Sequence, residues 1–376
     1  MRLLVISNFY PPHFVGGYEL GCRDVVEGLR ERGWDVTVLT SRYGVSRPTR
    51  DQGVERVLHA AFPPAERAAS TAAIDALRRR VVNRRLASRA SRRLQPDVVQ
   101  VWNPRYLGLS AALAVQSAGL PVSFFVSDSW LAEADPGDAA RLDLRHAQFA
   151  SEHLRRRALE AGRPVQEAEV AHWGVDLGRF QVAPGHGDPK RLLYVGQLLP
   201  EKGVQVALRA LRLIHDGRSG NAPTLTIVGG PDYYDRTRRL VEQLRLGGSV
   251  RLTGLVPRED LPEIYAAHDV LIFPSSVHEG FSITLLEAMA TGLAVVTTVT
   301  GGNAELAEHE VNCLTFEPED PAGCAAAVVR LLDDPALARA LGSNARSRVD
   351  ERFRLETMID AVERNLMAAV ASRGNA

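Results

Sequence analysis

Residues 278–292 read HEGFSITLLEAMATG, between the apolar runs DVLIFPSS (269–276) and LAVVTT (293–298). This order predicts a strand, a loop, a helix and a second strand, which is a unit of a parallel α/β sheet. Two carboxylates, Glu279 and Glu287, interrupt the otherwise apolar unit. Because an unpaired carboxylate in an apolar setting is costly, the sequence indicates that something polar meets them.

The same alternation of strands and helices fills most of the chain. RLLVISN (2–8), a helical pattern that stops at Gly33, and WDVTVLTS (34–41) predict a βαβ unit. Two further strands continue this series, and a second series opens at RLLYVGQL (191–198). We therefore predict an α/β fold of two doubly wound Rossmann-like domains, residues 1–180 and 181–354, with ligands at the carboxyl ends of the strands.

The composition is that of an ordinary globular protein. The 376 residues are 45% hydrophobic and 24% charged, and no apolar run reaches the roughly 20 residues of a membrane span. The formal net charge is zero, so the charge balance does not point to nucleic acid. The three cysteines share no metal-type spacing and favour a reducing cytoplasm.

The start of the helix in the opening segment predicts an anion site. If Ser282 caps this helix, the N–H groups of Ile283, Thr284 and Leu285 point out of its N-terminus, where they attract phosphate. Glu287, one turn inside, suits a ribose diol, and Glu279 would face a sugar beyond the phosphates. The alternative is that Glu287 pairs with a core arginine and Glu279 is solvated.

Lys202, in YVGQLLPEKGV (194–204), is the second candidate for phosphate binding. The chain contains only two lysines, Lys190 and Lys202, among its 45 basic residues. An ammonium group at this strand end can act as a point charge on a diphosphate, and in a chain so rich in arginine this interpretation is favoured over an ordinary surface lysine.

The first domain offers two weaker candidates. Gly16 and Gly17 follow the first strand, where glycines permit close approach to a phosphate or sugar, but on this pattern alone a tight turn is the favoured explanation. Asp128 ends the strand in FFVSDSW, where it could contact the transferred group or simply begin a helix.

Residues 76–94, ALRRRVVNRRLASRASRRL, combine eight arginines with apolar residues at nearly helical spacing. The apolar side would comprise Leu77, Val81, Leu86, Ala90 and Leu94. Such a helix either rests on anionic lipid or packs on the core with a solvated basic face.

Together these motifs resemble the retaining glycosyltransferases of the GT-B fold in family four. The resemblance runs from the Gly16-Gly17 loop through HWGVDLGRF, VGQLLPEKG and TIVGG to EGFSITLLE and GGNAE, and E-x7-E followed by A-M-A-x-G is its most specific part. It implies two Rossmann-like domains facing across a cleft, with a last helix, residues 355–376, that returns to the N-terminal, acceptor-binding domain.

The resemblance also implies roles for individual residues. Glu279, Asp128 and Lys202 would be the catalytic groups. No cofactor is expected, because the nucleotide-sugar is a co-substrate, and no metal is expected, because the sequence has neither a Cys/His cluster nor an Asp-x-Asp motif. The donor would be held by Gly16, Gly17, Gly196, Gln197, Lys202, Leu255, Val256, Gly280, Phe281, Ser282, Ile283, Thr284, Leu285 and Glu287. Ser127 and Gln197 stand where the family usually has histidine and arginine, and Ser282 replaces a turn glycine.

The implied activity is transfer of a sugar from a nucleoside-diphosphate sugar, with UDP favoured, to an acceptor hydroxyl or amine with retention of configuration. A nucleotide-sugar epimerase and a catalytically degenerate nucleotide-binding protein are the alternatives. The acceptor, a small molecule or a lipid-linked glycan, is left open. We expect a cytoplasmic protein, and the arginine-rich helix leaves open a peripheral contact with the inner face of an anionic membrane.

Overall fold

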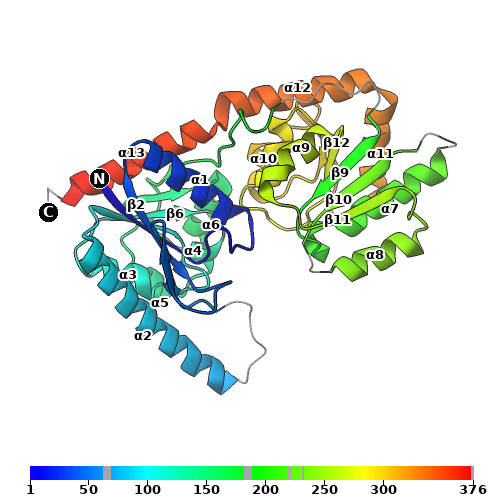
Figure 1. The fold of residues 1–376 in the computed structure, drawn as a ribbon. Helices are drawn as coiled ribbons and strands as arrows, with labels where there is room; N and C mark the ends of the chain where they lie inside the picture. Colours follow the sequence, from blue (N-terminus) through cyan, green and yellow to red (C-terminus); the bar gives the residue numbers. More distant parts are fainter. Residues whose placement is uncertain (62–68, 182–188, 219, 221, 231–232, 374–376) are drawn as a thin grey trace. The chain divides into compact units, whose positions relative to one another are not determined.

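The computed structural model describes residues 1–61, 69–181, 189–218, 220, 222–230 and 233–373. The chain divides into two compact units, Met1–Trp173 with Leu355–Ala376, and Gly174–Arg354 (Figure 1). The division falls seven residues before the expected boundary at 180. Most of the expected linker, APGHGDPK (183–190), lies outside the described residues.

Residues 174–181 belong to the second unit because their contacts lie there. The N–H of Val175 donates to the carbonyl of Phe353 at 3.0 Å. The ring of Phe180 meets the edge of Tyr265, with centroids 5.9 Å apart.

The first unit is built on an eight-stranded sheet with the order β3-β4-β2-β1-β5-β6-β7-β8, in which only β3 runs antiparallel to its neighbour. Its strands are β1 (Arg2–Ser7), β2 (Asp35–Ser41), β3 (Thr49–Asp51), β4 (Val54–Leu58), β5 (Val98–Asn103), β6 (Val122–Val126), β7 (Ala147–Phe149) and β8 (Glu169–Val170). Its helices are α1 (Gly17–Glu31), α2 (Ala69–Leu94), α3 (Ser110–Gln116), α4 (Trp130–Glu133), α5 (Pro136–Ala139), α6 (Glu152–Glu160) and α13 (Leu355–Arg373).

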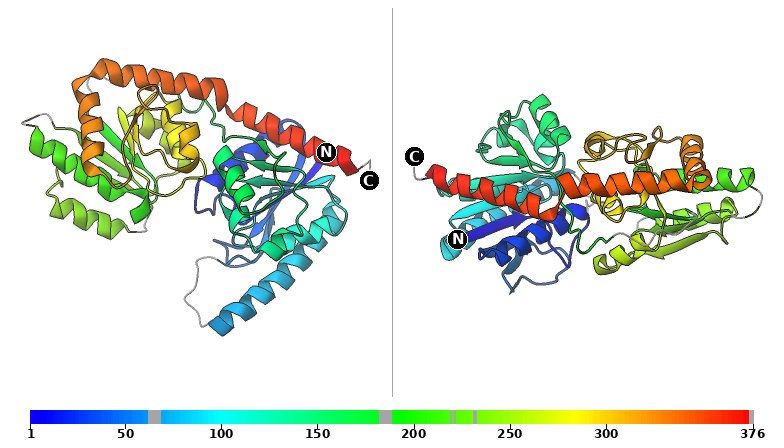
Figure 2. Two further views of the ribbon diagram at one scale, coloured as in Figure 1. Left: turned by 180° about the vertical axis from the view of Figure 1, so that it is seen from behind. Right: turned by 90° about the horizontal axis from the view of Figure 1, so that it is seen from above.

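The final helix, α13, packs against α1 within this unit (Figure 2). Gly28 permits the approach, because a Cβ there would lie 2.3 Å from Cδ1 of Ile359. Polar contacts complete the join, since both the indole N–H of Trp34 (2.7 Å) and the guanidinium of Arg32 (2.6 Å) donate to the carboxylate of Glu363. Helix α13 thus contributes to the core of the first unit.

The second unit contains a six-stranded parallel sheet with the order β11-β10-β9-β12-β13-β14. Its strands are β9 (Arg191–Val195), β10 (Thr224–Val228), β11 (Val250–Gly254), β12 (Val270–Phe273), β13 (Ala294–Thr297) and β14 (Leu314–Thr315). Its helices are α7 (Val204–Gly217), α8 (Tyr234–Gln243), α9 (Leu261–Ala266), α10 (Ile283–Ala290), α11 (Pro321–Asp333) and α12 (Pro335–Arg352).

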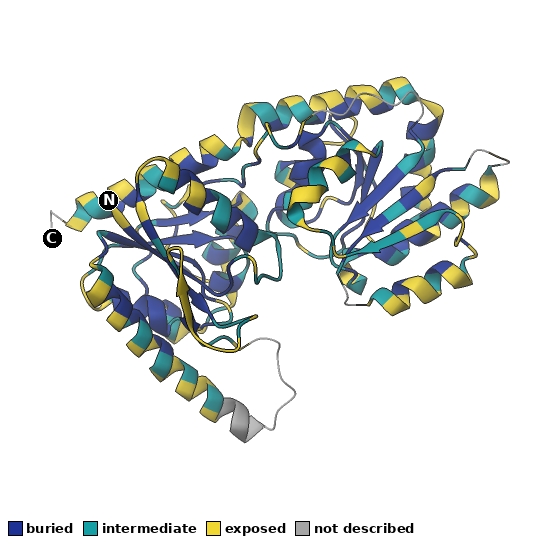
Figure 3. Cartoon of the chain, viewed as in Figure 1, coloured by how far each residue is buried: buried dark blue, intermediate teal, exposed yellow. Residues whose placement is uncertain are grey.

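Both faces of this sheet are covered, as the continuous apolar strands predict. Leu192 and Tyr194 of β9 join an apolar cluster with residues of α7 and α11. The alternate residues Leu193 and Val195 point to the opposite face and are also buried. The inner strands of both sheets are accordingly buried along most of their length, whereas the edge strands β3 and β11 contain no buried residue (Figure 3).

The alternative that the arginine-rich helix packs its apolar residues on the core does not hold in the N-terminal half of the helix. Leu77 and Val81 of α2 are 63% and 40% exposed. The buried residues are instead Asn83, Ala87, Ala90 and Ser91, because small side chains permit close packing of the C-terminal half of α2. No helix in the described part of the chain is both long and apolar enough to cross a membrane.

Candidate active site

The topology of the second unit defines where a ligand would bind. From β9 the chain adds β10 and β11 on one side, and then returns to add β12, β13 and β14 on the other. In such sheets, ligands bind outside the carboxyl ends of the strands at the point where the order reverses. That point lies between β9 and β12, and the loops that follow these strands carry Lys202 and Glu279 respectively.

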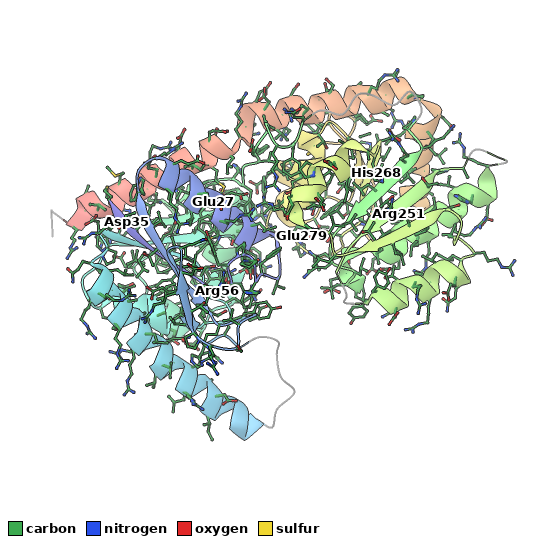
Figure 4. The ribbon with its side chains drawn as sticks, viewed as in Figure 1. Glu27, Asp35, Arg56, Arg251, His268 and Glu279 are labelled. Atoms are coloured by element: carbon green, nitrogen blue, oxygen red, sulfur yellow. The ribbon has the colours of Figure 1, made fainter. Side chains whose placement is uncertain are left out.

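The side chains of Lys202 and Glu279 meet at this point, although they are 77 residues apart in the sequence. Nζ of Lys202 lies 2.7 Å from Oε1 of Glu279, and the hydroxyl of Ser275 donates to the same oxygen at 2.6 Å. Both charged side chains are partly exposed, at 25% and 14%. Figure 4 labels Glu279 in the loop between β12 and α10.

Two glycines hold the loops that carry this pair. Gly203, next to Lys202, has φ +77°, and a Cβ there would lie 2.1 Å from the carbonyl oxygen of Pro274. Gly301 has φ +61°, and a Cβ there would lie 2.3 Å from the carbonyl oxygen of Glu279. Since only glycine fits both the conformation and the space at these positions, they fix the approach of three strand-end loops.

The N-terminus of α10 offers two free N–H groups rather than the three predicted. Ser282 is the N-cap, and its hydroxyl accepts a hydrogen bond from the N–H of Leu285 at 3.2 Å. The N–H of Ser282 itself donates to Oδ1 of Asn303 at 3.1 Å. The amides of Ser282 and Leu285 thus have partners within the protein, and a donor contact of these two residues stays a prediction.

The remaining amides, those of Ile283 and Thr284, have no hydrogen-bond partner within the described residues. Both residues are partly exposed. The first turn of this eight-residue helix can therefore still donate to a phosphate.

Glu287 is buried, with 3% of its surface exposed, and lies in a polar cluster. The hydroxyl of Tyr265 donates to its Oε2 at 3.1 Å, and the guanidinium of Arg258 lies 3.9 Å from its Oε1. Burial and the neighbouring Glu287 carboxylate raise the pKa of Tyr265 well above its usual value, so the hydroxyl stays protonated and can donate. The contact with Arg258 fits the alternative of a structural ion pair, and a ribose contact stays a prediction.

The other donor residues expected in this unit lie at strand ends. Leu255 follows β11 and is 76% exposed, which is unusual for a large apolar side chain, and Val256 beside it is partly exposed. The N–H of Gly196 is used in the sheet, where it donates to the carbonyl of Val228 at 3.0 Å. Gln197 is partly exposed, and its carbonyl accepts from the hydroxyl of Tyr194.

Gly280 and Phe281 complete the predicted donor set. Gly280 is partly exposed, while Phe281 is buried, with its ring 5.5 Å from that of Phe353. The Phe281 side chain therefore has a packing role.

The glycine pair of the first unit begins α1 without a strained backbone. Gly16, the N-cap, has φ −140°, and a Cβ there would make only ordinary contacts. The backbone at position 16 therefore does not require glycine, and close approach of a phosphate or sugar to the Gly16-Gly17 loop stays a prediction. The N–H of Gly16 is already used, because it donates to Oε2 of Glu19 at 3.0 Å. Gly17, the first residue of α1, is partly exposed.

Glu19 is fully buried, and burial raises the pKa of its carboxyl to about 7. Since the usual pKa is 4.5, the unfolded chain ionises first as the pH rises, so stability is lost between about pH 4.5 and 7. We expect Glu19→Gln to be as stable as the wild type near pH 4.5 and more stable, by up to about 3 kcal/mol, above pH 7. Urea unfolding between pH 4.5 and 7 measures the free energy of unfolding of both proteins. A difference between them that did not change with pH would contradict the prediction.

Asp128 has both carboxylate oxygens engaged within the first unit. Oδ2 accepts from Nδ2 of Asn103 at 2.8 Å and from Nε of Arg105 at 3.1 Å, while Oδ1 accepts from the N–H of Trp130 at 2.7 Å. Asp128 lies one residue before Ser129, the N-cap of α4, and its bond from the N–H of Trp130 fits the alternative of a role at the start of that helix. The adjacent Ser127 is buried.

Sequence reasoning missed several residues that hold the site together. Ser275 and Asn303 position Glu279 and Ser282, and Arg258 and Tyr265 surround Glu287. Asn303 lies in the GGNAE motif, so the sequence could have identified it as a site residue. No motif surrounds Arg258 or Tyr265, so the sequence offered no reason to select them. Within the described residues, no group of three or more His, Cys, Asp or Glu side chains is placed to hold a metal ion. Metal independence stays a prediction.

The chain folds into two α/β units. In the second unit, α10 begins with two N–H groups that are free within the described residues, and Lys202 pairs with Glu279 in the loop before this helix. These features are those of the GT-B class. The family model described as glycosyl transferases group 1 matches residues 179–348, and the glycosyl transferase 4-like domain matches residues 16–159. The chain belongs to the group 1 glycosyltransferases and is an enzyme of the transferase class.

Known relatives cover almost the whole chain. Glycogen synthase of Mycobacterium tuberculosis is 30% identical over 98% of this chain and 95% of its own. An uncharacterised glycosyltransferase of Methanocaldococcus jannaschii, MJ1607, is 25% identical over 94% of both chains. These matches extend across both units.

Solved structures confirm the GT-B fold. Sucrose-phosphate synthase of Thermosynechococcus elongatus has a TM-score of 0.78 at 21% identity and covers 98% of this chain and 99% of its own. HepE of Anabaena, in complex with UDP and glucose, has a TM-score of 0.78 at 20% identity and covers 98% and 100%.

Proposed function

We propose that this glycosyltransferase transfers a sugar from a nucleoside-diphosphate sugar, with UDP favoured, to an acceptor hydroxyl or amine with retained configuration and without a metal ion. The observation that carries the proposal is the meeting of Lys202 and Glu279 beside the free N–H groups of Ile283 and Thr284. A cation and two amides there match a diphosphate, and a carboxylate matches the hydroxyls of the attached sugar.

The two oxygens of Glu279 have different roles in this proposal. Oε1 accepts from both Lys202 and Ser275, whereas Oε2 has no hydrogen-bond partner among the described residues. Oε2 can therefore accept from a sugar hydroxyl. Because the carboxylate is partly neutralised by Lys202, it is a poor nucleophile, and we do not assign it a covalent step.

In the proposed reaction the bond between the anomeric carbon and the diphosphate oxygen breaks as the acceptor attacks on the same face. The acceptor proton passes to the leaving diphosphate. Lys202 and the α10 amides stabilise the charge that develops on this leaving group, in positions set before the reaction begins.

Glu287 is proposed to hold the ribose. Tyr265 and Arg258 fix its carboxylate, so its orientation would be set before the nucleotide arrives. Leu255, exposed beyond β11, offers an apolar surface for the base.

The identity of the base is tested by thermal shift. We expect UDP to raise the melting temperature more than GDP, ADP or TDP. At 100 times the dissociation constant, binding stabilises the native state by about 2.7 kcal/mol, or roughly 5–10 °C for a domain of this size.

The complex of HepE with UDP supports UDP. The rival is GDP, because a GDP-mannose-dependent mannosyltransferase of Mycobacterium tuberculosis is 30% identical over 56% of this chain. The absence of a shift with all four nucleotides would contradict the proposed donor class.

Turnover separates transfer from the alternatives. With the matching nucleotide-sugar and a sugar acceptor, we expect diphosphate release and a new glycosidic bond with the donor's anomeric configuration, detected by NMR. Donor interconversion without acceptor would indicate an epimerase, and nucleotide binding without turnover across a donor and acceptor panel would indicate a degenerate protein. The family assignment favours transfer.

A further inference from the structure

The two halves of α2 have different surroundings. In its C-terminal half, small and polar residues are buried against the first unit, where Asn83 donates to the carbonyls of His59 and Leu107. In its N-terminal half, Ile74 and Leu77 are 67% and 63% exposed and Val81 is 40% exposed. Burial along this helix is accordingly confined to the part near the sheet (Figure 3).

The exposed apolar residues form one stripe. Residues three and seven positions after Ile74 return to nearly the same side of a helix, so Ile74, Leu77 and Val81 fall within an arc of about 60°. Asn83 and Ala87 lie on the other half of the helix, which is the buried half. The stripe therefore points away from the unit that carries it.

Positive charge surrounds the stripe. Of the eight arginines in α2, Arg80 pairs with Asp138 and Arg93 pairs with Glu55. The others make no salt bridge within the part of the chain that the structure describes; these are Arg78, Arg79, Arg84, Arg85, Arg89 and Arg92. The helix from residue 74 onward has a single acidic residue, Asp75. We name the set Ile74, Leu77, Val81, Arg78, Arg85 and Arg89 the outer face of α2.

We propose that the outer face of α2 docks on the surface of an anionic lipid bilayer. An anionic bilayer is the partner whose charge is complementary to this face. The guanidinium groups that make no salt bridge within the described residues can bind lipid phosphates, and the apolar residues at one end of the face can insert at the boundary between headgroups and acyl chains. With only three apolar side chains, binding would be peripheral and reversible, and it would depend on negatively charged lipid.

The surface has a consequence for the acceptor that rests on the proposed function. The first unit is the expected acceptor-binding domain, so docking through α2 would bring that domain to the lipid surface and favour a lipid-linked acceptor. Membrane binding is measured without donor or acceptor, so its failure is distinguishable from failure of the transferase proposal.

Vesicle flotation of the full chain tests the docking. We expect binding to phosphatidylcholine vesicles that contain phosphatidylglycerol, at least about tenfold stronger than to pure phosphatidylcholine, and weaker at high salt. The triple substitution Arg78→Gln, Arg85→Gln and Arg89→Gln should reduce binding by about 100-fold, since each basic residue near such a surface contributes roughly fivefold.

Matched controls lie on exposed surface elsewhere. Arg339→Gln on α12 and Leu213→Ser on α7, whose side chain is 47% exposed, should bind as the wild type does. Leu77→Ser, which removes one exposed apolar side chain from the outer face, should weaken binding. Circular dichroism melting checks that every variant is folded.

A fluorescent probe tests insertion separately. In the variant Leu77→Trp, the emission should shift to the blue when anionic vesicles are added, and the same probe in Leu213→Trp should not respond.

Three results would overturn the proposal: equal binding to both vesicle types, binding that the outer-face substitutions leave unchanged, or self-association abolished by Leu77→Ser. The last would show that a second copy of the chain covers this face.

Discussion

Replacing Lys202 by alanine is expected to lower kcat for sugar transfer by about 10²–10³-fold. The ammonium group pairs with Glu279 in the loop that precedes α10, and loss of one preorganised group that stabilises developing charge has an effect of this size. Steady-state kinetics with the donor identified by thermal shift measures the loss. We expect most of it in kcat, because the charge on the leaving diphosphate develops in the transition state.

Lys190 provides the matched control, because it is the only other lysine in the chain. Lys190→Ala should retain activity within about twofold. Glu279→Gln should lose activity as well, while the shape of the side chain is kept. If Lys202→Ala and Glu279→Gln both retained full turnover with a confirmed acceptor, the proposed site would be incorrect.

The substitution Gly203→Ala is expected to lower the free energy of unfolding of the second unit by about 3 kcal/mol or more. Two costs combine: a side chain at φ +77° is unfavourable by roughly 1 kcal/mol, and the Cβ would overlap the carbonyl oxygen of Pro274. Because relief of the overlap moves the loop of Lys202 away from that of Glu279, donor affinity should fall too. Urea unfolding and calorimetric titration with nucleotide measure the two effects.

Gly33→Ala isolates the conformational cost. Gly33 also has a positive φ, of +85°, but a Cβ there would meet nothing within 4 Å. Gly33→Ala should therefore lower the free energy of unfolding by only about 1 kcal/mol. If Gly203→Ala and Gly33→Ala lowered the free energy of unfolding equally, Pro274 would have to move at no cost to make room for the new Cβ. The predicted overlap at position 203 would then be wrong.

The fold could be predicted because its main strands are apolar runs bounded by turns. The strand of the opening segment, DVLIFPSS, became β12, and LAVVTT became β13. The strands that the sequence did not reveal are short or carry charges. β4 contains Glu55 and Arg56, while β7 and β8 have three and two residues. Pairing with neighbouring strands, rather than local pattern, makes these segments extended.

The candidate site was predictable in its parts but not in its contacts. The helix start at Ser282 followed from its position before an apolar helix, and the structure confirms it as the N-cap. The N–H of Ser282 donates to the side chain of Asn303, which lies 21 residues later in the chain, so the local sequence does not reveal this bond. The pairing of Lys202 with Glu279 depends on the strand order, because only adjacency of β9 and β12 brings their loops together.

The arginine-rich helix shows why spacing alone misplaces a buried face. Leu77 and Val81 continue the apolar pattern of α2 but are exposed, while Asn83 is buried because its amide group pairs with backbone carbonyls. A polar residue with satisfied hydrogen bonds can occupy the core side of a helix, and no sequence period reveals its partners.

The most direct test of the central claim is a crystal structure with the nucleoside diphosphate that gives the largest thermal shift. Our account places phosphate oxygens about 3 Å from the N–H groups of Ile283 and Thr284 and from Nζ of Lys202, with the ribose toward Glu287. A diphosphate bound elsewhere, with Lys202 and Glu279 still paired and the α10 N-terminus empty, would contradict it.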